Sequence, residues 1–174
     1  FSNAVNASAF GTSAQATAES AIALGTSTEA SGISSTAIGD SATSSNIQAV
    51  ALGANSTSSG YQSIAFGFNA KASGQCSVSF GSQSFTNATG SIAIGPSAIS
   101  SGVNAIAVGT NSSATCADSF VIGAGAIANG IAAGAIGYLA NTQGIDAMAV
   151  GVKACALGNN SLALGTQSVA SGVD

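Results

Sequence analysis

A glycine returns every 14 residues along the chain, and this strict period constrains the fold more than any other feature of the sequence. An unbroken period of this length is typical of repeat architectures, in which each unit packs on the next one. No residue is inserted or deleted between successive repeats. We therefore expect a single repeat domain over residues 1–174, built from twelve coils. The structural repeat glycines are Gly11, Gly25, Gly39, Gly53, Gly67, Gly81, Gly95, Gly109, Gly123, Gly137, Gly151 and Gly165.

The residues before each repeat glycine have the alternation of a short β-strand. The residue directly before the glycine is large and apolar in all twelve repeats, and the residue before that is Ala in ten of them. Three places before the glycine, nine of the twelve residues are again large and apolar. Because side chains alternate between the faces of a strand, the two large residues share one face. The pattern predicts a strand that points its bulky side chains inside.

A second strand, with small side chains, follows each repeat glycine. The residues three and five places after the glycine are Ala, Ser or Thr in every repeat, as at Ala70 and Ala72. We expect these small residues to point inside as well. Seven places after the glycine, eight of the twelve residues are Gly, including Gly60. We expect glycine to mark both bends of a coil, because a side chain would penalise the backbone conformations needed there.

Two short strands in each repeat favour a β-solenoid over a helical fold. Large residues spaced by two and then by twelve positions form neither a 3.6-residue stripe nor a heptad seam. Two glycines per repeat would each cost a helix about 1 kcal/mol. Coils stacked at the strand-pairing distance of about 4.8 Å would form a rod on the order of 55 Å long. The predicted fold class is all-β, a parallel β-roll (β-solenoid) of twelve 14-residue coils.

The string S-x-A-I-G-x-x-A-x-A-x-G recurs in this register, as in residues 91–102 and 63–74. It resembles the head repeats of trimeric autotransporter adhesins of the YadA type, over essentially the whole chain. The resemblance implies a left-handed parallel β-roll, a homotrimer, and extracellular display at the tip of a cell-surface fibre anchored in the bacterial outer membrane. It also implies adhesion to host matrix proteins such as collagen or fibronectin, or to other bacteria, and thereby a role in virulence. The family's stalk and membrane anchor have no counterpart here, so we expect the chain to be a head fragment.

A further apolar column stands eight places after the repeat glycine, where seven of the twelve residues are apolar. A roll whose second strand offers only Ala, Ser and Thr has little interior of its own. We therefore interpret the column as a candidate trimer interface, although these side chains could instead fold over the corner of the roll. The candidate interface residues are Ile33, Ile47, Tyr61, Val103, Ile131, Ile145 and Val173.

Composition excludes several classes of function. The chain has no His, which excludes Ser-His-Asp and Cys-His catalytic sets within it. Its six acidic residues are isolated, and even Asp118 and Asp146, which share a phase, stand two coils or about 10 Å apart, too far to share one ion. Two lysines and no arginine cannot form the basic surface that binds nucleic acid. We therefore expect no enzyme, no cofactor, no metal and no nucleic-acid partner, and no apolar run is long enough for membrane contact by this segment.

Three cysteines, Cys76, Cys116 and Cys155, are separated by about three coils each, or roughly 14 Å along the axis. A disulfide needs Cα atoms within about 7 Å. We therefore expect small buried thiols and no intrachain disulfide, with interchain links as the alternative.

Three aromatic residues are candidate surface anchors. Phe68 and Tyr138 fall just after a repeat glycine, and Phe85 falls in the polar part of the second strand. Aromatic side chains often anchor interfaces, and these could bind a receptor or pack between the chains of a trimer. Sequons for N-glycosylation, relevant only in a source that glycosylates asparagine, stand at Asn6, Asn55, Asn87, Asn111 and Asn159.

The sequence therefore favours a surface-exposed adhesive head module that binds matrix proteins or cell-surface receptors as a homotrimer. The alternative is a structural fibre or filament subunit, for example of a viral or phage fibre, because coils in perfect register could stack end to end through exposed strand edges. Ice binding is a weaker third hypothesis, because the column after the repeat glycine does not hold Thr consistently.

Overall fold

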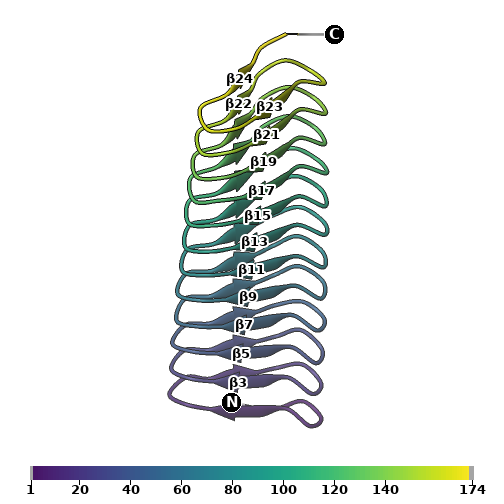
Figure 1. The fold of residues 1–174 in the computed structure, drawn as a ribbon. Helices are drawn as coiled ribbons and strands as arrows, with labels where there is room; N and C mark the ends of the chain where they lie inside the picture. Colours follow the sequence, from purple (N-terminus) through teal and green to yellow (C-terminus); the bar gives the residue numbers. More distant parts are fainter. Residues whose placement is uncertain (1, 173–174) are drawn as a thin grey trace.

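Each 14-residue repeat makes one turn of a β-solenoid, and successive turns stack into a column that rises from the N-terminus to the C-terminus (Figure 1). The computed structural model describes residues 2–172. Every coil contains one strand of three residues and one strand of two residues, joined by bends. Across residues 2–172 there is no helix of the length and apolarity that a membrane crossing would need. The predicted parallel β-solenoid of twelve coils is confirmed.

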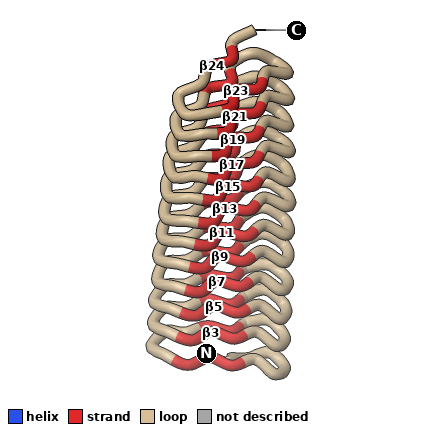
Figure 2. Tube along the Cα trace, in the orientation of Figure 1, coloured by secondary structure: helices blue, strands red, loops and turns tan. Residues whose placement is uncertain are grey.

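The strands form two parallel sheets of twelve strands that run the length of the column (Figure 2). Pairing partners are always 14 residues apart, as for Ile64 and Val78, so the sheet register equals the sequence period. The long-strand sheet contains β1 (Ser8–Phe10), β3 (Ile22–Leu24), β5 (Thr36–Ile38), β7 (Val50–Leu52), β9 (Ile64–Phe66), β11 (Val78–Phe80), β13 (Ile92–Ile94), β15 (Ile106–Val108), β17 (Phe120–Ile122), β19 (Gly134–Ile136), β21 (Met148–Val150) and β23 (Leu162–Leu164). The short-strand sheet contains β2 (Gln15–Ala16), β4 (Glu29–Ala30), β6 (Thr43–Ser44), β8 (Thr57–Ser58), β10 (Lys71–Ala72), β12 (Phe85–Thr86), β14 (Ile99–Ser100), β16 (Ser113–Ala114), β18 (Ile127–Ala128), β20 (Asn141–Thr142), β22 (Cys155–Ala156) and β24 (Val169–Ala170).

The interior between the two sheets holds only small side chains. Ala65 and Ala70 are fully buried, whereas Ile64 and Phe66, on either side of Ala65, are 40% and 42% exposed. The prediction that the first strand points its bulky residues inside is therefore wrong, although the two large residues do share one face. The fully buried positions hold Ala, Ser or Thr, with Val121 as the largest side chain, because the two strands of a coil leave no room for Ile, Leu or Phe.

Hydroxyl groups in this interior bond to one another or to nearby carbonyls. The Oγ atoms of Ser58 and Ser63 lie 2.6 Å apart, and those of Ser79 and Ser84 lie 2.7 Å apart. Among the buried side-chain nitrogen and oxygen atoms of residues 2–172, only Ser44 Oγ has no hydrogen-bond partner. With the exception of Ser44, the hydroxyl groups in the core of residues 2–172 therefore leave no buried polar atom unpaired.

The two bends of a coil need glycine for partly different reasons. The repeat glycines at the first bend have φ between +115° and +150°, a region that penalises any other residue. The glycines at the second bend do not have positive φ. A Cβ atom on Gly60, for example, would collide with the main-chain carbonyl of Gly74 in the next coil. The expected conformational reason thus holds at the first bend, where a Cβ atom on most of these glycines would also meet the next coil. At the second bend, close approach between coils is the reason alone.

Candidate functional site

The outer side of the long-strand sheet is an apolar surface along the whole column, with Ser8 and Thr36 as its polar positions. The first and third residues of its strands point away from the interior, and we call the surface they form the apolar face. Large side chains such as Leu24, Phe80 and Ile122 are exposed on it over the whole column. Monomeric soluble proteins rarely expose apolar patches of more than a few hundred Å², and larger ones mark interaction sites.

One position of the apolar face lacks a side chain. Gly134 is the first residue of β19 and is buried, because the Phe120 ring and the Met148 sulfur occupy the space where its Cβ atom would stand. The neighbouring side chains therefore close the gap, and the apolar face stays continuous over this coil.

The predicted interface column lies at the second bend, beside the apolar face. Ile47 is three residues before Val50, the first residue of β7, and the same spacing holds in every coil. These interface residues thus extend the apolar face around one edge of the solenoid. Val173 lies outside the described residues. The other members are 38–51% exposed, and they are Ile33, Ile47, Tyr61, Val103, Ile131 and Ile145.

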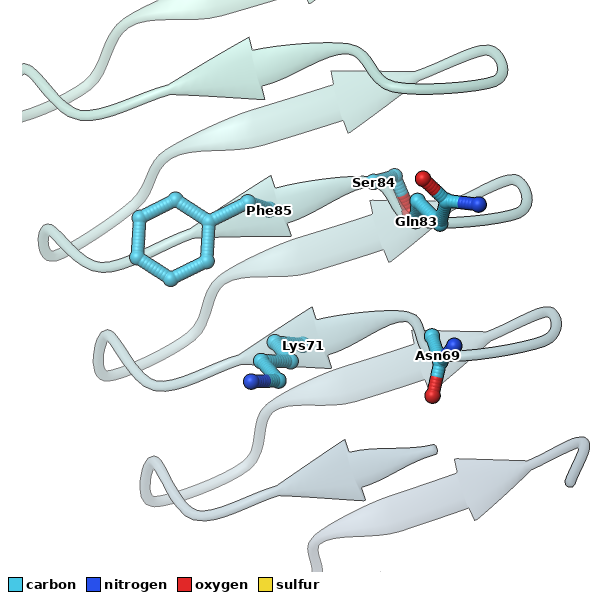
Figure 3. A pocket seen from close by; sticks show the side chains of 5 residues that line it. All are labelled: Asn69, Lys71, Gln83, Ser84 and Phe85. Carbon is cyan, nitrogen blue, oxygen red and sulfur yellow. The ribbon is translucent and has the colours of Figure 1, made fainter. Parts of the chain in front are cut away.

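The three predicted surface anchors do not come together. Phe68 and Tyr138 are exposed at the first bend, five coils apart. Phe85 is half-buried on the outer side of the short-strand sheet, where it lines an open depression of about 410 Å³. Figure 3 shows the residues around this depression, which are Asn69, Lys71, Gln83, Ser84 and Phe85.

The depression is built from equivalent positions of two neighbouring coils. Lys71 and Phe85 pair side by side in β10 and β12. Asn69 and Gln83 stand two residues earlier in the same two coils. Of the five residues, only Phe85 was predicted from the sequence. The 14-residue spacing from Phe85 back to Lys71 could have identified Lys71 as its neighbour in the sheet.

The three thiols are free, as expected, but none of them is buried. Cys76 is exposed, and Cys116 and Cys155 are half-buried. The predicted burial is wrong because all three stand at coil positions that do not point into the interior. Cys116 donates a hydrogen bond from its sulfur to the Asn129 carbonyl oxygen at 2.9 Å. Within residues 2–172, no three His, Cys, Asp or Glu side chains gather in a way that could hold a metal ion.

In a comparison with protein families, the chain matches the YadA head domain repeat (2 copies). The matched segments cover well over half of the chain, and they are residues 2–28, 30–56, 58–84, 72–98, 87–112, 100–126 and 156–174. A comparison with curated proteins finds no match.

Proposed function

This chain belongs to the family of YadA head domain repeats, and from that membership we propose that it is the adhesive head module of a homotrimeric fibre. The family consists of adhesin-type β-solenoids and is not an enzyme family. The proposal includes left-handed winding of the coils and display outside the cell from the outer membrane. It also includes adhesion to host matrix proteins or to receptors on other cells.

The apolar face is the observation that carries the proposal. The core contains almost only Ala, Ser and Thr, while the Ile, Leu, Val and Phe side chains of the long-strand sheet, except for Val121, remain outside it. Covering apolar surface stabilises an assembly by about 25 cal/mol per Å². Three copies arranged around a closed threefold axis would cover the apolar face of each copy without leaving one exposed.

The interface column fits the same arrangement. Ile131 and Ile145 stand on the edge of the apolar face, where a chain that turns this face to the axis meets its neighbours. The short-strand sheet faces the other way and then remains open to the medium. Its outer positions in the first coils are polar or charged, as at Gln15, Glu29 and Lys71. Receptors would therefore reach this sheet and the first bend, where Phe68 and Tyr138 are exposed.

The mass of the purified chain in solution, measured by light scattering over a range of concentrations, tests the assembly. We expect a constant mass of three times the 16.3 kDa of one chain. A mass that grows with concentration would favour a filament subunit, and a monomer throughout would contradict the trimer. Binding of the trimer to immobilised collagen and fibronectin then tests adhesion. A trimer that binds neither protein nor any cell surface would contradict the proposed adhesive function.

A further inference from the structure

We propose that the depression around Lys71 and Phe85 binds an acidic sugar, that is, a pyranose carrying a carboxylate group. This assignment rests on the proposed function, because it names the class of ligand that the adhesive head recognises. The depression combines an aromatic ring, one cationic group and two amides within two neighbouring coils. In small-ligand sites, placed polar groups fix the orientation of a ligand that rests on apolar surface, and here one ring supplies that surface.

The Phe85 ring supplies the apolar part of the site. Its side chain lies half-buried on the outer side of the short-strand sheet, between Lys71 and Ile99 in the neighbouring strands. The face of an aromatic ring carries partial negative charge. It therefore attracts the weakly positive C–H groups on the less polar side of a pyranose ring.

Lys71 supplies the charge that selects an acid. Its neighbours in the sheet are Thr57 and Phe85, so no carboxylate stands at either adjacent position of its column. The nearest acidic residue in that column is Glu29, three coils away. The exposed ammonium group is a compact charge with three donors on a flexible stem, and it can follow a bound carboxylate.

Asn69 and Gln83 supply the groups for sugar hydroxyls. Both have left-handed backbone conformations, with φ of 55° and 60°, at the first bend of their coils. Their main-chain N–H groups donate to the carbonyl oxygens of Ala54 and Phe68, at 3.0 and 2.8 Å. The side-chain amides, each with two donor hydrogens and an acceptor oxygen, are then the groups that serve neighbouring hydroxyls of a ligand.

The floor of the depression is held before any ligand arrives. Ser84 is buried, and its Oγ donates to the Gly81 carbonyl oxygen at 2.8 Å and lies 2.7 Å from Ser79 Oγ. Its carbonyl oxygen accepts the main-chain N–H of Lys71 at 2.9 Å. A preformed site loses less entropy on binding than a mobile one.

The position of the depression suits a multivalent head. It lies on the short-strand sheet, whereas the apolar face belongs to the long-strand sheet. The proposed trimer therefore presents three copies of the depression to the outside. Weak binding at each copy would add up on a polyvalent glycan.

Saturation-transfer NMR and titration of the full chain test the assignment, with 3′-sialyllactose, a hyaluronan tetrasaccharide and neutral lactose as probes. We expect at least one acidic probe to bind at least tenfold more tightly than lactose. Binding of sialyllactose alone would identify sialic acid as the source of the carboxylate, and binding of the hyaluronan fragment alone would identify uronic acid. Lys71→Gln and Phe85→Ala should each weaken this binding at least tenfold. Lys153→Gln, which removes the other lysine, and Ile127→Ala, on the outer side of the same sheet but three coils from Phe85, should leave it unchanged.

Two results would overturn the assignment: neither acidic probe binds more tightly than lactose, or the Lys71 and Phe85 variants bind like the unaltered chain. Light scattering on the same samples separates this outcome from failure of the proposed assembly. A trimer that does not bind acidic sugars would contradict only the proposed sugar site. A monomer that does bind them would contradict only the proposed trimer.

Discussion

Phe66 and Phe80 occupy the same position in neighbouring coils, and their rings stack with centroids 4.7 Å apart and planes 4° from parallel. This separation is close to the spacing of about 4.8 Å between paired strands, so the coil repeat itself sets the stacking. Both rings lie on the apolar face, and they remain 42% and 49% exposed. The pair therefore forms a stacked aromatic patch on the apolar face, in the region where we propose that copies meet.

Phe80→Lys should dissociate the trimer, because the substitution would bring three ammonium groups together near the axis. The coils should keep their structure, since the side chain does not enter the core. We expect a mass of one chain by light scattering and an unchanged far-ultraviolet circular dichroism spectrum. Ile99→Lys, on the outer side of the short-strand sheet, is the matched control and should remain a trimer. A trimeric Phe80→Lys chain would show that the apolar face is not the interface.

The double variant Ile131→Lys and Ile145→Lys tests the interface column separately. Both side chains stand at the edge of the apolar face and are about half exposed. We expect the midpoint concentration for trimer dissociation to rise at least tenfold, as measured by sedimentation. An unchanged midpoint would place this column outside the interface.

Ala93→Leu should destabilise the fold, because Ala93 is fully buried between the two strands of its coil. Overpacking a tight core costs about 1–3 kcal/mol, and this core has little freedom to adjust. We expect a lower midpoint of urea unfolding at a fixed protein concentration. Ile94→Leu, one residue further and on the outer side, should change the midpoint little. Equal midpoints for both variants would contradict an interior that accepts only small side chains.

Gly109→Ala and Gly165→Ala separate the two costs of a side chain at the first bend. Both glycines have positive φ, +137° and +115°. A Cβ atom on Gly109 would also stand 2.5 Å from the Gly123 carbonyl oxygen, whereas Gly165 has open space around it. We expect Gly109→Ala to lower the unfolding midpoint clearly more than Gly165→Ala does. Equal effects would mean that backbone conformation alone requires glycine there.

Cys76 should react with a maleimide reagent before Cys116 and Cys155 do, because it is the exposed thiol. Mass spectrometry of the folded chain should show one fast addition, and the unfolded chain should show three. Cys76→Ser should remove the fast phase. A fast phase that survives this substitution would contradict the exposure that the structure assigns to the three thiols.

The sequence period predicted the coils because the pairing register and the repeat are the same 14 residues, as Ile64 and Val78 show. The orientation of the first strand was predicted wrongly, because large apolar residues were assumed to point inside. The four residues before each repeat glycine do indicate which side chains point inside. The residue four places before it, such as Ser63 or Ser91, is Ala or Ser in all twelve repeats. It alternates with the large residues, so the small ones form the interior.

The candidate sites were less accessible from sequence. The period places Lys71 beside Phe85, but the depth of the depression depends on how the Asn69 and Gln83 side chains stand at the bend. The apolar face follows from the same alternation, since large residues that share a strand with buried small ones must stand on its outer side. Membership of the family was predictable because many copies of one string stand in a single register.

The direction of the hydrogen bonds between coils has a mechanical consequence. Bonds such as that from the N–H of Ile92 to the carbonyl oxygen of Ala105 link one coil to the next along the axis. A force that pulls the two ends apart along this axis therefore loads these bonds lengthwise and one coil at a time. Each coil that peels away releases 14 residues, or about 45–50 Å of extended chain. Under load, the solenoid would lengthen in even steps and dissipate work at each one.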